Sequence, residues 1–295
     1  MNNNDNLSRH YALIVNPVSG GFHRGKISSA LAKLGAEGIA VELLYTSSAG
    51  DAEQFARNIC ARHENPVIMV AGGDGTVNSV VNGMSPAATL ALVPIGTANV
   101  LALELGINSI DDALARITSG KTIPLSVGQL DNGREQRLFV LMAGIGLDGS
   151  VCEKVTGTGK KLLGKGVYLL SALQRLLFWE KGKLAVTIDG REIICHSLVI
   201  CNSAHYGGSF RLALATDIFS PGLEVVCFQD CQRGTYLKLA FNLFTGRKLS
   251  KEDVTRIPAQ TIKVMGRKAV QIDGDFFGYS PVIVRTIEGH GSIIV

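Results

Sequence analysis

This chain of 295 residues lacks the features that mark several large protein classes. No apolar run approaches the length of a transmembrane helix, because the longest candidate, residues 168–179, is interrupted by Gln174 and Arg175. The first residues are polar and contain no basic segment followed by an apolar stretch, so we do not expect a secreted protein. Aromatic residues make up only 6% of the chain and form no platform with basic residues, which argues against a nucleic-acid partner.

Cysteine motifs and common nucleotide-binding motifs are also missing. The six cysteines form no Cys-x-x-Cys pair and no zinc-type spacing with the six histidines, and Cys201 and Cys227 lie in apolar runs. Such thiols are typical of buried positions in a reducing compartment, so we expect a cytoplasmic protein. There is no Gly-x-Gly-x-x-Gly after the first predicted strand and no P-loop, since the fragment 157–160 lacks the first glycine of that motif.

The first part of the chain alternates predicted strands and helices. The strands are expected at 11–15, 39–44, 67–70 and 90–93, and the helices at 26–34, 50–61, 77–81, 99–105 and 110–117. Alternation at this spacing predicts a parallel sheet with helices on both faces.

After residue 122 the apolar runs become short, rich in β-formers and separated by turn residues. Strands are expected at 128–130, 138–142, 184–188, 197–201, 223–228, 261–264, 269–272 and 282–285. Asp189-Gly190 between two such runs predicts a hairpin. This part is therefore predicted to be a mainly antiparallel β domain with one or two inserted helices, beginning near Ile123-Pro124.

Three loops rich in small residues follow predicted strands of the first part. They are Asn16-Pro17-Val18-Ser19-Gly20-Gly21, Gly72-Gly73-Asp74-Gly75-Thr76 and Pro94-Ile95-Gly96-Thr97-Ala98-Asn99. The carboxyl ends of parallel strands meet at one edge of a sheet, and glycine lets backbone N–H groups approach an anion closely. One Gly-Asp-Gly segment alone is equally typical of an ordinary turn. Three such loops at one edge predict a phosphate site at the start of the following helices.

Basic residues gather between 151 and 183, although the whole chain carries a net charge of only +4. This segment has seven Lys or Arg residues, against Glu153 and Glu180, and it flanks the apolar run 168–179. The combination is expected where a protein rests on an anionic membrane, and a solvated surface over a core helix is the commoner alternative.

The loops resemble the diacylglycerol kinase catalytic-domain family, most closely its soluble bacterial lipid kinases. The similar segments are Gly72–Asn78 with Val81-Asn82-Gly83, Pro94–Asn99 with Leu105-Gly106-Ile107, Asn16–Gly20, Gly50-Asp51-Ala52, Asn202, Tyr206-Gly207-Gly208 and Asp273-Gly274-Asp275. The Gly-Gly-Asp-Gly-Thr segment is shared with NAD kinases, whereas the Gly-Thr-Ala-Asn segment points to lipid kinases.

The resemblance implies two domains of the NAD kinase and diacylglycerol kinase type. An α/β nucleotide-binding domain with a mostly parallel sheet is expected at 1–123, and a mainly antiparallel β-sandwich domain at 124–285, with the active site in the cleft between them. In this family the last residues typically return to the first domain, so the resemblance implies that residues 286–295 can belong to the first domain.

The resemblance also implies ATP and Mg²⁺ as cofactors. The residues expected to bind the nucleotide are Asn16, Ser19, Thr46, Gly72, Gly73, Asp74, Gly75, Thr76, Val77, Asn78, Gly96, Thr97 and Asn99. Asp74 would organise the loop and the metal or its waters, and a turn-capping carboxylate is the structural alternative.

Asp275, Asp273 and Asp74 form the predicted catalytic set. Asp275 stands where the family usually has Glu, the implied general base, so its side chain is one methylene shorter. A general base must come within about 2.6–3.2 Å of its partner, so the shortening matters, and Asp273 is the alternative base. Asp-Gly is also typical of a hairpin turn.

A second departure from the family concerns a structural metal. Relatives often carry Asp-Gly-Leu-Leu-Asp, whose first Asp helps to bind Mg²⁺, and this chain has Ser220-Pro221-Gly222-Leu223-Glu224. Proline offers no side-chain ligand, so the resemblance implies that this site is lost at Pro221, with Asp217 as the nearest carboxylate.

The predicted function is an ATP-dependent lipid kinase with a diacylglycerol-like acceptor. A lipid substrate implies transient contact with a membrane surface and peripheral membrane association. Two alternatives stay open: a kinase for a soluble acceptor such as NAD, and a catalytically impaired nucleotide- or lipid-binding regulator. The sequence does not set the oligomeric state, and a homodimer is one option.

Overall fold

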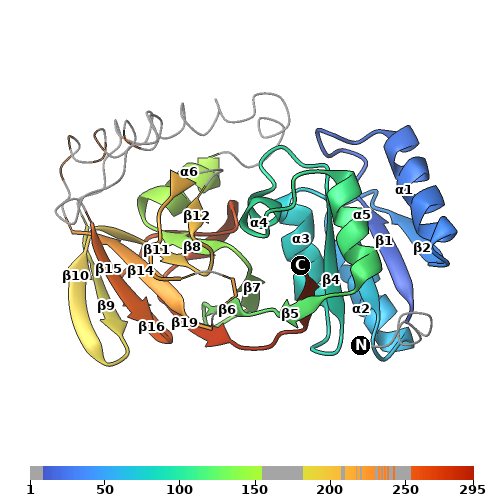
Figure 1. The fold of residues 1–295 in the computed structure, drawn as a ribbon. Helices are drawn as coiled ribbons and strands as arrows, with labels where there is room; N and C mark the ends of the chain where they lie inside the picture. The colour runs from blue at the N-terminus through green and yellow to red at the C-terminus, as the bar shows by residue number, and fades with distance from the viewer. Residues whose placement is uncertain are drawn as a thin grey trace. The chain divides into compact units, whose positions relative to one another are not determined.

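The computed structural model describes residues 9–154, 182–206, 210–216, 218–219, 221–229, 232, 234, 236, 238, 242 and 254–295. The chain divides into two compact units, one formed by residues up to Val127 together with Ile287–Val295, the other by Gly128–Thr286 (Figure 1). The apolar run 168–179, most of the basic segment, the 157–160 fragment, Gly207-Gly208, Asp217 and Ser220 lie outside the described residues.

The first unit is built on a six-stranded sheet with the order β2-β1-β3-β4-β20-β5. Its strands are β1 (Tyr11–Val15), β2 (Val41–Tyr45), β3 (Val67–Gly72), β4 (Thr89–Pro94), β5 (Thr122–Pro124) and β20 (Ser292–Ile294). Neighbouring strands of this sheet run parallel, except for β20 and β5, which pair antiparallel. The predicted α/β domain with a mostly parallel sheet is therefore confirmed.

Five helices belong to the described part of this unit: α1 (Arg24–Ala36), α2 (Asp51–Arg62), α3 (Asp74–Gly83), α4 (Val100–Glu104) and α5 (Ile110–Ser119). α1 packs beside α5, and α2 packs beside α3. Central strands are buried along their whole length, as strands covered on both faces must be. A Cβ on Gly83 would lie 2.2 Å from the carbonyl oxygen of Glu53, so glycine at this position lets α3 lie close against α2.

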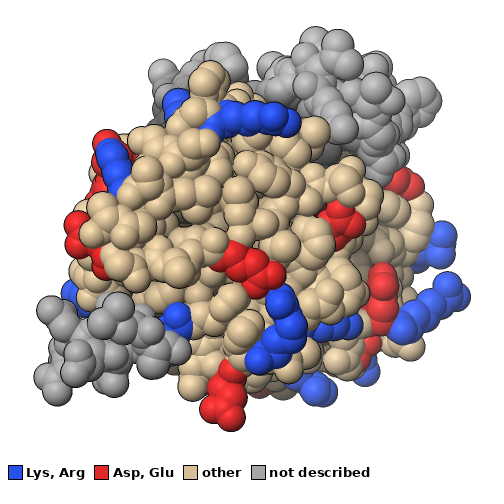
Figure 2. Space-filling view, turned by 90° about the vertical axis from the view of Figure 1, so that its right-hand side faces the viewer, with Lys and Arg blue, Asp and Glu red and all other residues tan. Residues whose placement is uncertain are grey.

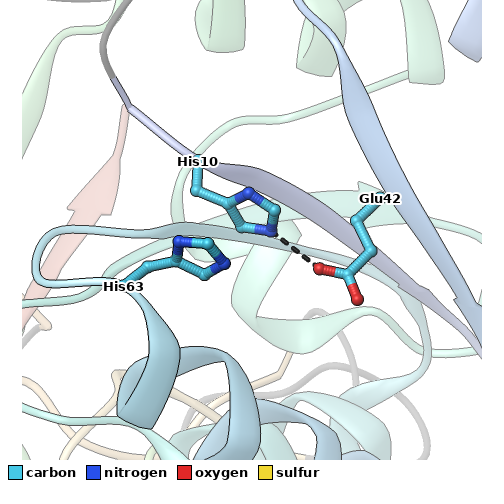
Figure 3. Close-up of side chains that lie close together, drawn as sticks. All are labelled: His10, Glu42 and His63. Carbon is cyan, nitrogen blue, oxygen red and sulfur yellow. Dashed lines mark hydrogen bonds and ion pairs between the residues drawn. The ribbon is translucent and has the colours of Figure 1, made fainter.

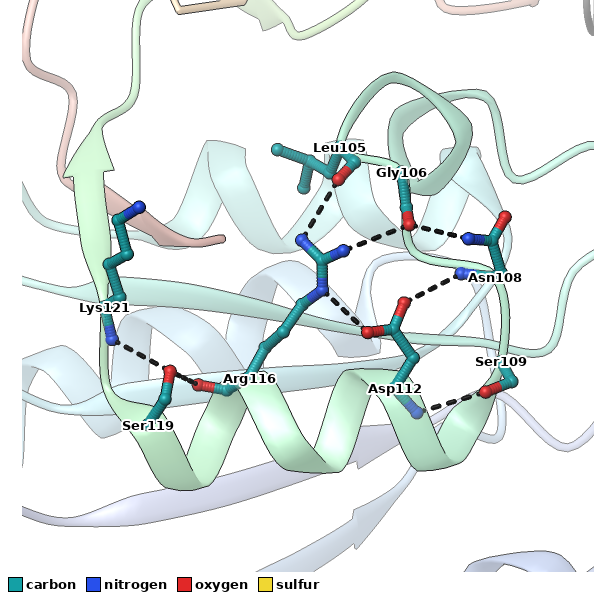
Figure 4. A network of polar contacts seen from close by, with 8 residues as sticks. All are labelled: Leu105, Gly106, Asn108, Ser109, Asp112, Arg116, Ser119 and Lys121. Carbon is teal, nitrogen blue, oxygen red and sulfur yellow. Dashed lines mark hydrogen bonds and ion pairs between the residues drawn. The ribbon is translucent and has the colours of Figure 1, made fainter.

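A network around Arg116 holds the segment that follows α4 (Figure 4). The Arg116 guanidinium donates to the carbonyl oxygens of Leu105 and Gly106 at 3.1 Å each and to Asp112 at 3.0 Å. The hydrogen bond from Arg116 lowers the pKa of Asp112. The network thus ties the carboxyl end of α4, the helix that follows the Gly96–Asn99 loop, to α5.

The second unit contains two six-stranded sheets that enclose one core. One has the order β10-β9-β16-β19-β6-β7 and the other β15-β14-β11-β8-β17-β18. The elements are β6 (Val127–Asp131), β7 (Gln136–Phe139), β8 (Met142–Ile145), α6 (Leu147–Lys154), β9 (Leu184–Ile188), β10 (Arg191–Cys195), β11 (Ser197–Cys201), β12 (His205–Tyr206), β13 (Phe210–Arg211), β14 (Leu223–Phe228), β15 (Thr255–Ala259), β16 (Thr261–Met265), β17 (Ala269–Ile272), β18 (Asp275–Tyr279) and β19 (Val282–Ile287). Apolar residues from both sheets, such as Phe139, Ile200 and Ile262, form the shared core. The predicted antiparallel β-sandwich is confirmed.

Charged side chains are mixed on the face that Figure 2 presents. Lys, Arg, Asp and Glu are scattered there among uncharged residues. Several described charges of the molecule are paired, as in Lys33–Asp111 at 2.7 Å. Within the described part of the chain, no helix is both long enough and apolar enough to cross a membrane.

Candidate functional site

The three predicted loops lie at one edge of the first unit's sheet. In register, Val15 of β1 pairs with Tyr45 of β2 and Ala71 of β3, and Gly72 pairs with Pro94 of β4, so these strands end level with one another. β1 lies between β2 and β3, which makes the gap between β1 and β3 the point where the strand order reverses. Ligands of open α/β sheets bind at this kind of switch point.

Contacts between the loops place them against one another. Asn16 after β1 donates through Nδ2 to Thr76 Oγ1 at 2.9 Å, directly across the switch point. A Cβ on Gly96 would lie 2.4 Å from the Cα of Gly73, and one on Gly20 would lie 3.1 Å from Thr97 Oγ1. The backbones approach closely because these positions carry no side chain.

The glycine loop itself forms the start of a helix. The sequence predicts a helix from residue 77, but α3 begins at Asp74, with Gly73 as an N-cap that makes no side-chain capping bond. The first turn of α3 therefore lies at the sheet edge. Its first donor is the Thr76 N–H, which bonds the Gly73 carbonyl at 2.9 Å, so the N–H groups of Asp74 and Gly75 have no intrahelical partner. Such a turn attracts phosphate through its N–H groups and its dipole.

Asp74 and Asn99 line a small pocket at this helix start. Asp74 Oδ1 accepts from the Leu101 N–H at 3.2 Å, and Asn99, in the left-handed region at φ 47°, donates through Nδ2 to the Gly96 carbonyl at 2.9 Å. Gly72 and Gly73 also line the pocket, and its remaining lining residues, such as Leu101, are apolar. Among the described residues, Asn99 Oδ1 is a buried acceptor without a hydrogen-bond partner, which suits a ligand that supplies a donor or a cation.

The other residues predicted to bind the nucleotide lie in the loops after β1 and β2 and in the first turns of α3. Ser19 lies in the turn after β1, where its N–H donates to the Asn16 carbonyl, and Thr46 follows β2. Gly75, Thr76, Val77 and Asn78 belong to α3. Val77 is buried and is one of the apolar residues that line the pocket beside Asp74.

Asp51 shapes the loop after β2. Its carboxylate accepts from the backbone N–H groups and the hydroxyls of both Ser47 and Ser48 at 2.7–2.9 Å. These hydrogen bonds, led by the one from the Ser47 N–H, hold the pKa of Asp51 far below its usual value. The carboxylate stabilises the loop that contains Thr46 and begins α2.

The residues at this edge fit ATP phosphates and one Mg²⁺ ion. N–H groups at the start of α3 can donate to phosphate oxygens, and the glycines let the loop backbones come together at that point. Asp74 is the only carboxylate in the segments 16–21, 72–78 and 94–99. One carboxylate is enough, because Mg²⁺ in nucleotide sites is usually held by one or two carboxylates together with phosphates and water.

Asp273-Gly274 forms the two-residue turn between β17 and β18 in the second unit. Both residues have positive φ, 47° and 87°, as a type I′ hairpin turn requires. Asp275 is the first residue of β18, pairs with Ile272, and is exposed. The segment is therefore a hairpin turn, as its Asp-Gly composition predicts, and it also presents the exposed carboxylate of Asp275.

Asp273 binds backbone rather than facing outward. Its carboxylate accepts from the N–H groups of Val140, Leu141 and Met142 at 2.8–2.9 Å. The sequence predicts an unbroken strand at 138–142, but β7 ends at Phe139 and β8 begins at Met142. The strand breaks because Asp273 takes the N–H groups that a sheet partner would use, while Asn202 donates to the Val140 carbonyl at 2.7 Å.

Three polar residues meet near this turn, and two of them, Asp148 and Gln271, were missed by sequence reasoning. Asp148 of α6 accepts from the Tyr206 hydroxyl at 2.5 Å and from Gln271 Nε2 at 2.7 Å. Only Tyr206 lay in a segment of family resemblance, and nothing in the spacing relates it to the other two. Gln271 is nearly fully buried in an otherwise apolar strand, and that one polar residue was the available sign.

Internal hydrogen bonds hold the described residues around Pro221, where the resemblance implies that a structural metal site is lost. Thr216 donates through Oγ1 to the carbonyl of Gly222, the residue after Pro221, at 3.0 Å. The buried Glu224 carboxylate accepts from the N–H groups of Leu214 and Ala215 at 2.8 and 2.6 Å.

One group of described side chains could hold a metal ion, but at the wrong edge of the sheet for phosphate chemistry. His10, Glu42 and His63 come together at the amino ends of β1 and β2 (Figure 3). The two imidazoles stack at 3.6 Å, and His10 bonds Glu42 at 2.7 Å. Arg62 contacts both Glu42 oxygens at 3.0 and 3.2 Å, so its charge opposes a cation there. Desolvation, then the charges of His10 and Arg62, lower the pKa of His63.

Comparison with known proteins identifies the family. Residues 10–130 match the family model described as diacylglycerol kinase catalytic domain, and residues 142–294 match the one described as YegS C-terminal NAD kinase beta sandwich-like domain. The chain belongs to the diacylglycerol kinase family. A diacylglycerol kinase of Bacillus subtilis (strain 168) is 28% identical to this family member, over 91% of this chain and 90% of the relative.

Solved structures agree with the fold of the diacylglycerol kinase family. One from Bacillus anthracis str. Sterne, described as a diacylglycerol kinase, has a TM-score of 0.77 at 26% identity and covers 97% of this chain and 96% of that chain. An NAD kinase from Archaeoglobus fulgidus in complex with ATP has a TM-score of 0.53 at 13% identity, over 97% of this chain and 93% of that chain. The second likeness concerns the fold alone.

Proposed function

We propose that this member of the diacylglycerol kinase family transfers the γ-phosphate of ATP to a lipid hydroxyl, with a diacylglycerol-like acceptor as the first expectation. The observation that carries the proposal is the meeting of three glycine-containing loops at one edge of the sheet, beside its switch point, where one of them begins α3. Family membership adds the reaction class. Because the acceptor resides in a bilayer, the proposal includes transient contact with a membrane surface.

The reaction assigns a separate task to each carboxylate. The lipid hydroxyl oxygen attacks the γ-phosphorus, the bond to the β,γ-bridging oxygen breaks, ADP leaves, and the hydroxyl proton passes to Asp275. Asp273 is the weaker proton acceptor, because its carboxylate already accepts from three backbone N–H groups. Asp74 would hold Mg²⁺ or its waters, and the ion would supply neutralisation of phosphate charge.

A lipid panel with labelled ATP tests the proposal. Purified protein is incubated with Mg²⁺, γ-labelled ATP and vesicles that carry one hydroxyl-bearing lipid at a time, diacylglycerol among them, with NAD as a separate soluble acceptor. We expect label in a lipid product. Asp275→Asn should lower kcat by about 10²–10⁴-fold, the usual contribution of a general base.

Asp111→Asn is the matched control, because Asp111 is 75% exposed on α5 and forms a surface ion pair with Lys33. It should leave kcat unchanged. Labelled product from NAD and none from lipid would favour the soluble-acceptor alternative. Nucleotide binding without any labelled product would favour a non-catalytic regulator.

A further inference from the structure

A chain of short hydrogen bonds leads from the partly buried carboxylate of Asp148 to the turn that contains Asp275. Asp148 accepts from Gln271 Nε2 at 2.7 Å, and Gln271 Oε1 in turn accepts from the Gly274 N–H at 2.7 Å. Tyr206 donates its hydroxyl to the other Asp148 oxygen at 2.5 Å. Gly274 directly precedes Asp275, so the last link of the chain lies one residue from the proposed base.

Two glycines allow Asp148 to occupy this position. A Cβ on Gly144 would lie 2.0 Å from Asp148 Oδ2, so the carboxylate rests on the bare backbone of β8. A Cβ on Gly149 would lie 2.1 Å from the Ala269 carbonyl oxygen, so α6 can press directly against β17. The two close approaches hold the Asp148 side chain beside Gln271.

The donors and acceptors in this row of hydrogen bonds allow only one orientation of the Gln271 amide. The Asp148 carboxylate only accepts, so it must face the NH₂ group of Gln271, and this turns Oε1 toward the Gly274 N–H. Gln271 is 2% exposed and lies at a register shift between β17 and β18, where bulges often redirect side chains beside functional sites. Burial raises the pKa of the Asp148 carboxyl, and the hydrogen bonds from Tyr206 and Gln271 only partly offset this.

We propose that Asp148 and Gln271 are positioning residues for phosphoryl transfer: Asp148 orients the Gln271 amide, and Gln271 fixes the Gly274 N–H and thereby the direction of Asp275. The inference rests on the proposed function of Asp275. A purely structural role would stabilise the unit without affecting the chemical step. The test must therefore measure kcat and stability separately.

Exchanging the two side-chain types provides that test. Gln271→Glu keeps an acceptor toward Gly274 but sets a carboxylate oxygen against Asp148. The double variant Asp148→Asn/Gln271→Glu restores every link, because the new amide at position 148 donates to the new carboxylate at position 271, while the amide oxygen accepts from Tyr206. Asp111→Asn, the surface variant on α5, is the control outside this network and should leave kcat unchanged.

For Gln271→Glu we expect kcat on the lipid acceptor to fall about tenfold or more, equivalent to about 1.4 kcal/mol, with KM for ATP unchanged. The loss should be smaller at about pH 6 than at about pH 8, because one proton shared between the two carboxyl groups repairs the contact. The double variant should regain kcat to within about threefold of wild type, without this pH dependence.

Amide hydrogen exchange at Gly274 and Asp275 supplies a readout that needs no lipid substrate. Faster exchange in Gln271→Glu and recovery in the double variant are expected. Wild-type kcat in Gln271→Glu, or a double variant that folds but stays as slow as the single, would overturn the positioning role. An inactive wild type that still shows the exchange pattern would instead contradict the proposed function.

Discussion

At the scale of single residues, the Asp273-Gly274-Asp275 turn distinguishes two carboxylates by their contacts. Asp273 is partly buried and bound to the backbone of residues 140–142, whereas Asp275 is exposed at the start of β18. Both side chains look alike in the sequence. Their difference arises because one carboxylate replaces a sheet partner for a broken strand, and the other does not.

Asp273→Asn should therefore act on stability. The amide group offers one acceptor where the carboxylate offers two, and its NH₂ group faces a backbone N–H. We expect the free energy of unfolding to fall by about 2 kcal/mol, the cost of an unsatisfied buried donor. Urea denaturation measures this. Asp275→Asn is the control and should change stability by less than about 0.5 kcal/mol. Equal losses in both variants would contradict the assignment.

The sequence predicts that this segment is a hairpin turn, but it does not predict the different contacts of Asp273 and Asp275. Asp-Gly between two apolar runs predicts a hairpin from local chemistry alone, and both residues have the positive φ that such a turn needs. The partners of Asp273 lie 131–133 positions earlier in the chain. Asp148 and Gln271 are likewise 123 positions apart, so no local pattern relates them.

At the scale of elements, the alternation of strands and helices predicted the sheet and its binding edge. Buried parallel strands have continuous apolar runs, and their ends are marked by glycine, so both are visible in the sequence. The start of α3 was placed three residues late, because Asp74-Gly75-Thr76 has turn composition. Tertiary packing of Gly73 against Gly96 decides that this segment is the first helical turn.

Gly96→Ala tests this packing of loops. The new methyl group would lie 2.4 Å from the Gly73 Cα and 2.5 Å from Asn99 Oδ1, so the β4 loop must move away from the start of α3. We expect a stability loss of about 1–3 kcal/mol, the range for overpacking, and weaker ATP binding by calorimetry.

Gly35→Ala is the matched control for this substitution. A Cβ on Gly35 meets nothing within 4 Å, and the residue lies within α1, where alanine is the better helix former by up to about 1 kcal/mol. Stability should rise and ATP binding should stay unchanged. Unaltered ATP binding in Gly96→Ala would show that the three loops do not act together.

At the scale of the whole molecule, a strand from the last residues of the chain completes the sheet of the first unit. β20 pairs in parallel with β4 and antiparallel with β5, so residues near the carboxyl terminus fill the place between strands of the first unit (Figure 1). Flanking bonds support it, including His290 N–H to the Leu125 carbonyl at 2.8 Å and Val295 N–H to the Lys121 carbonyl at 3.0 Å. Composition cannot predict this, because a three-residue strand has no periodicity to detect.

Ile293→Ala measures what this strand contributes. Ile293 is fully buried between β4 and β5, and Ile-to-Ala changes in cores cost about 2–5 kcal/mol through lost burial and the cavity left behind. Hydrogen exchange should therefore accelerate in β4 and β5, while the strands of the second unit keep their protection. Ile194→Ala, at a position 64% exposed in β10, is the matched control and should change stability by less than about 0.5 kcal/mol. If exchange in β4 stayed at its wild-type rate, β20 would be an appendage of the sheet rather than the strand that joins its two sides.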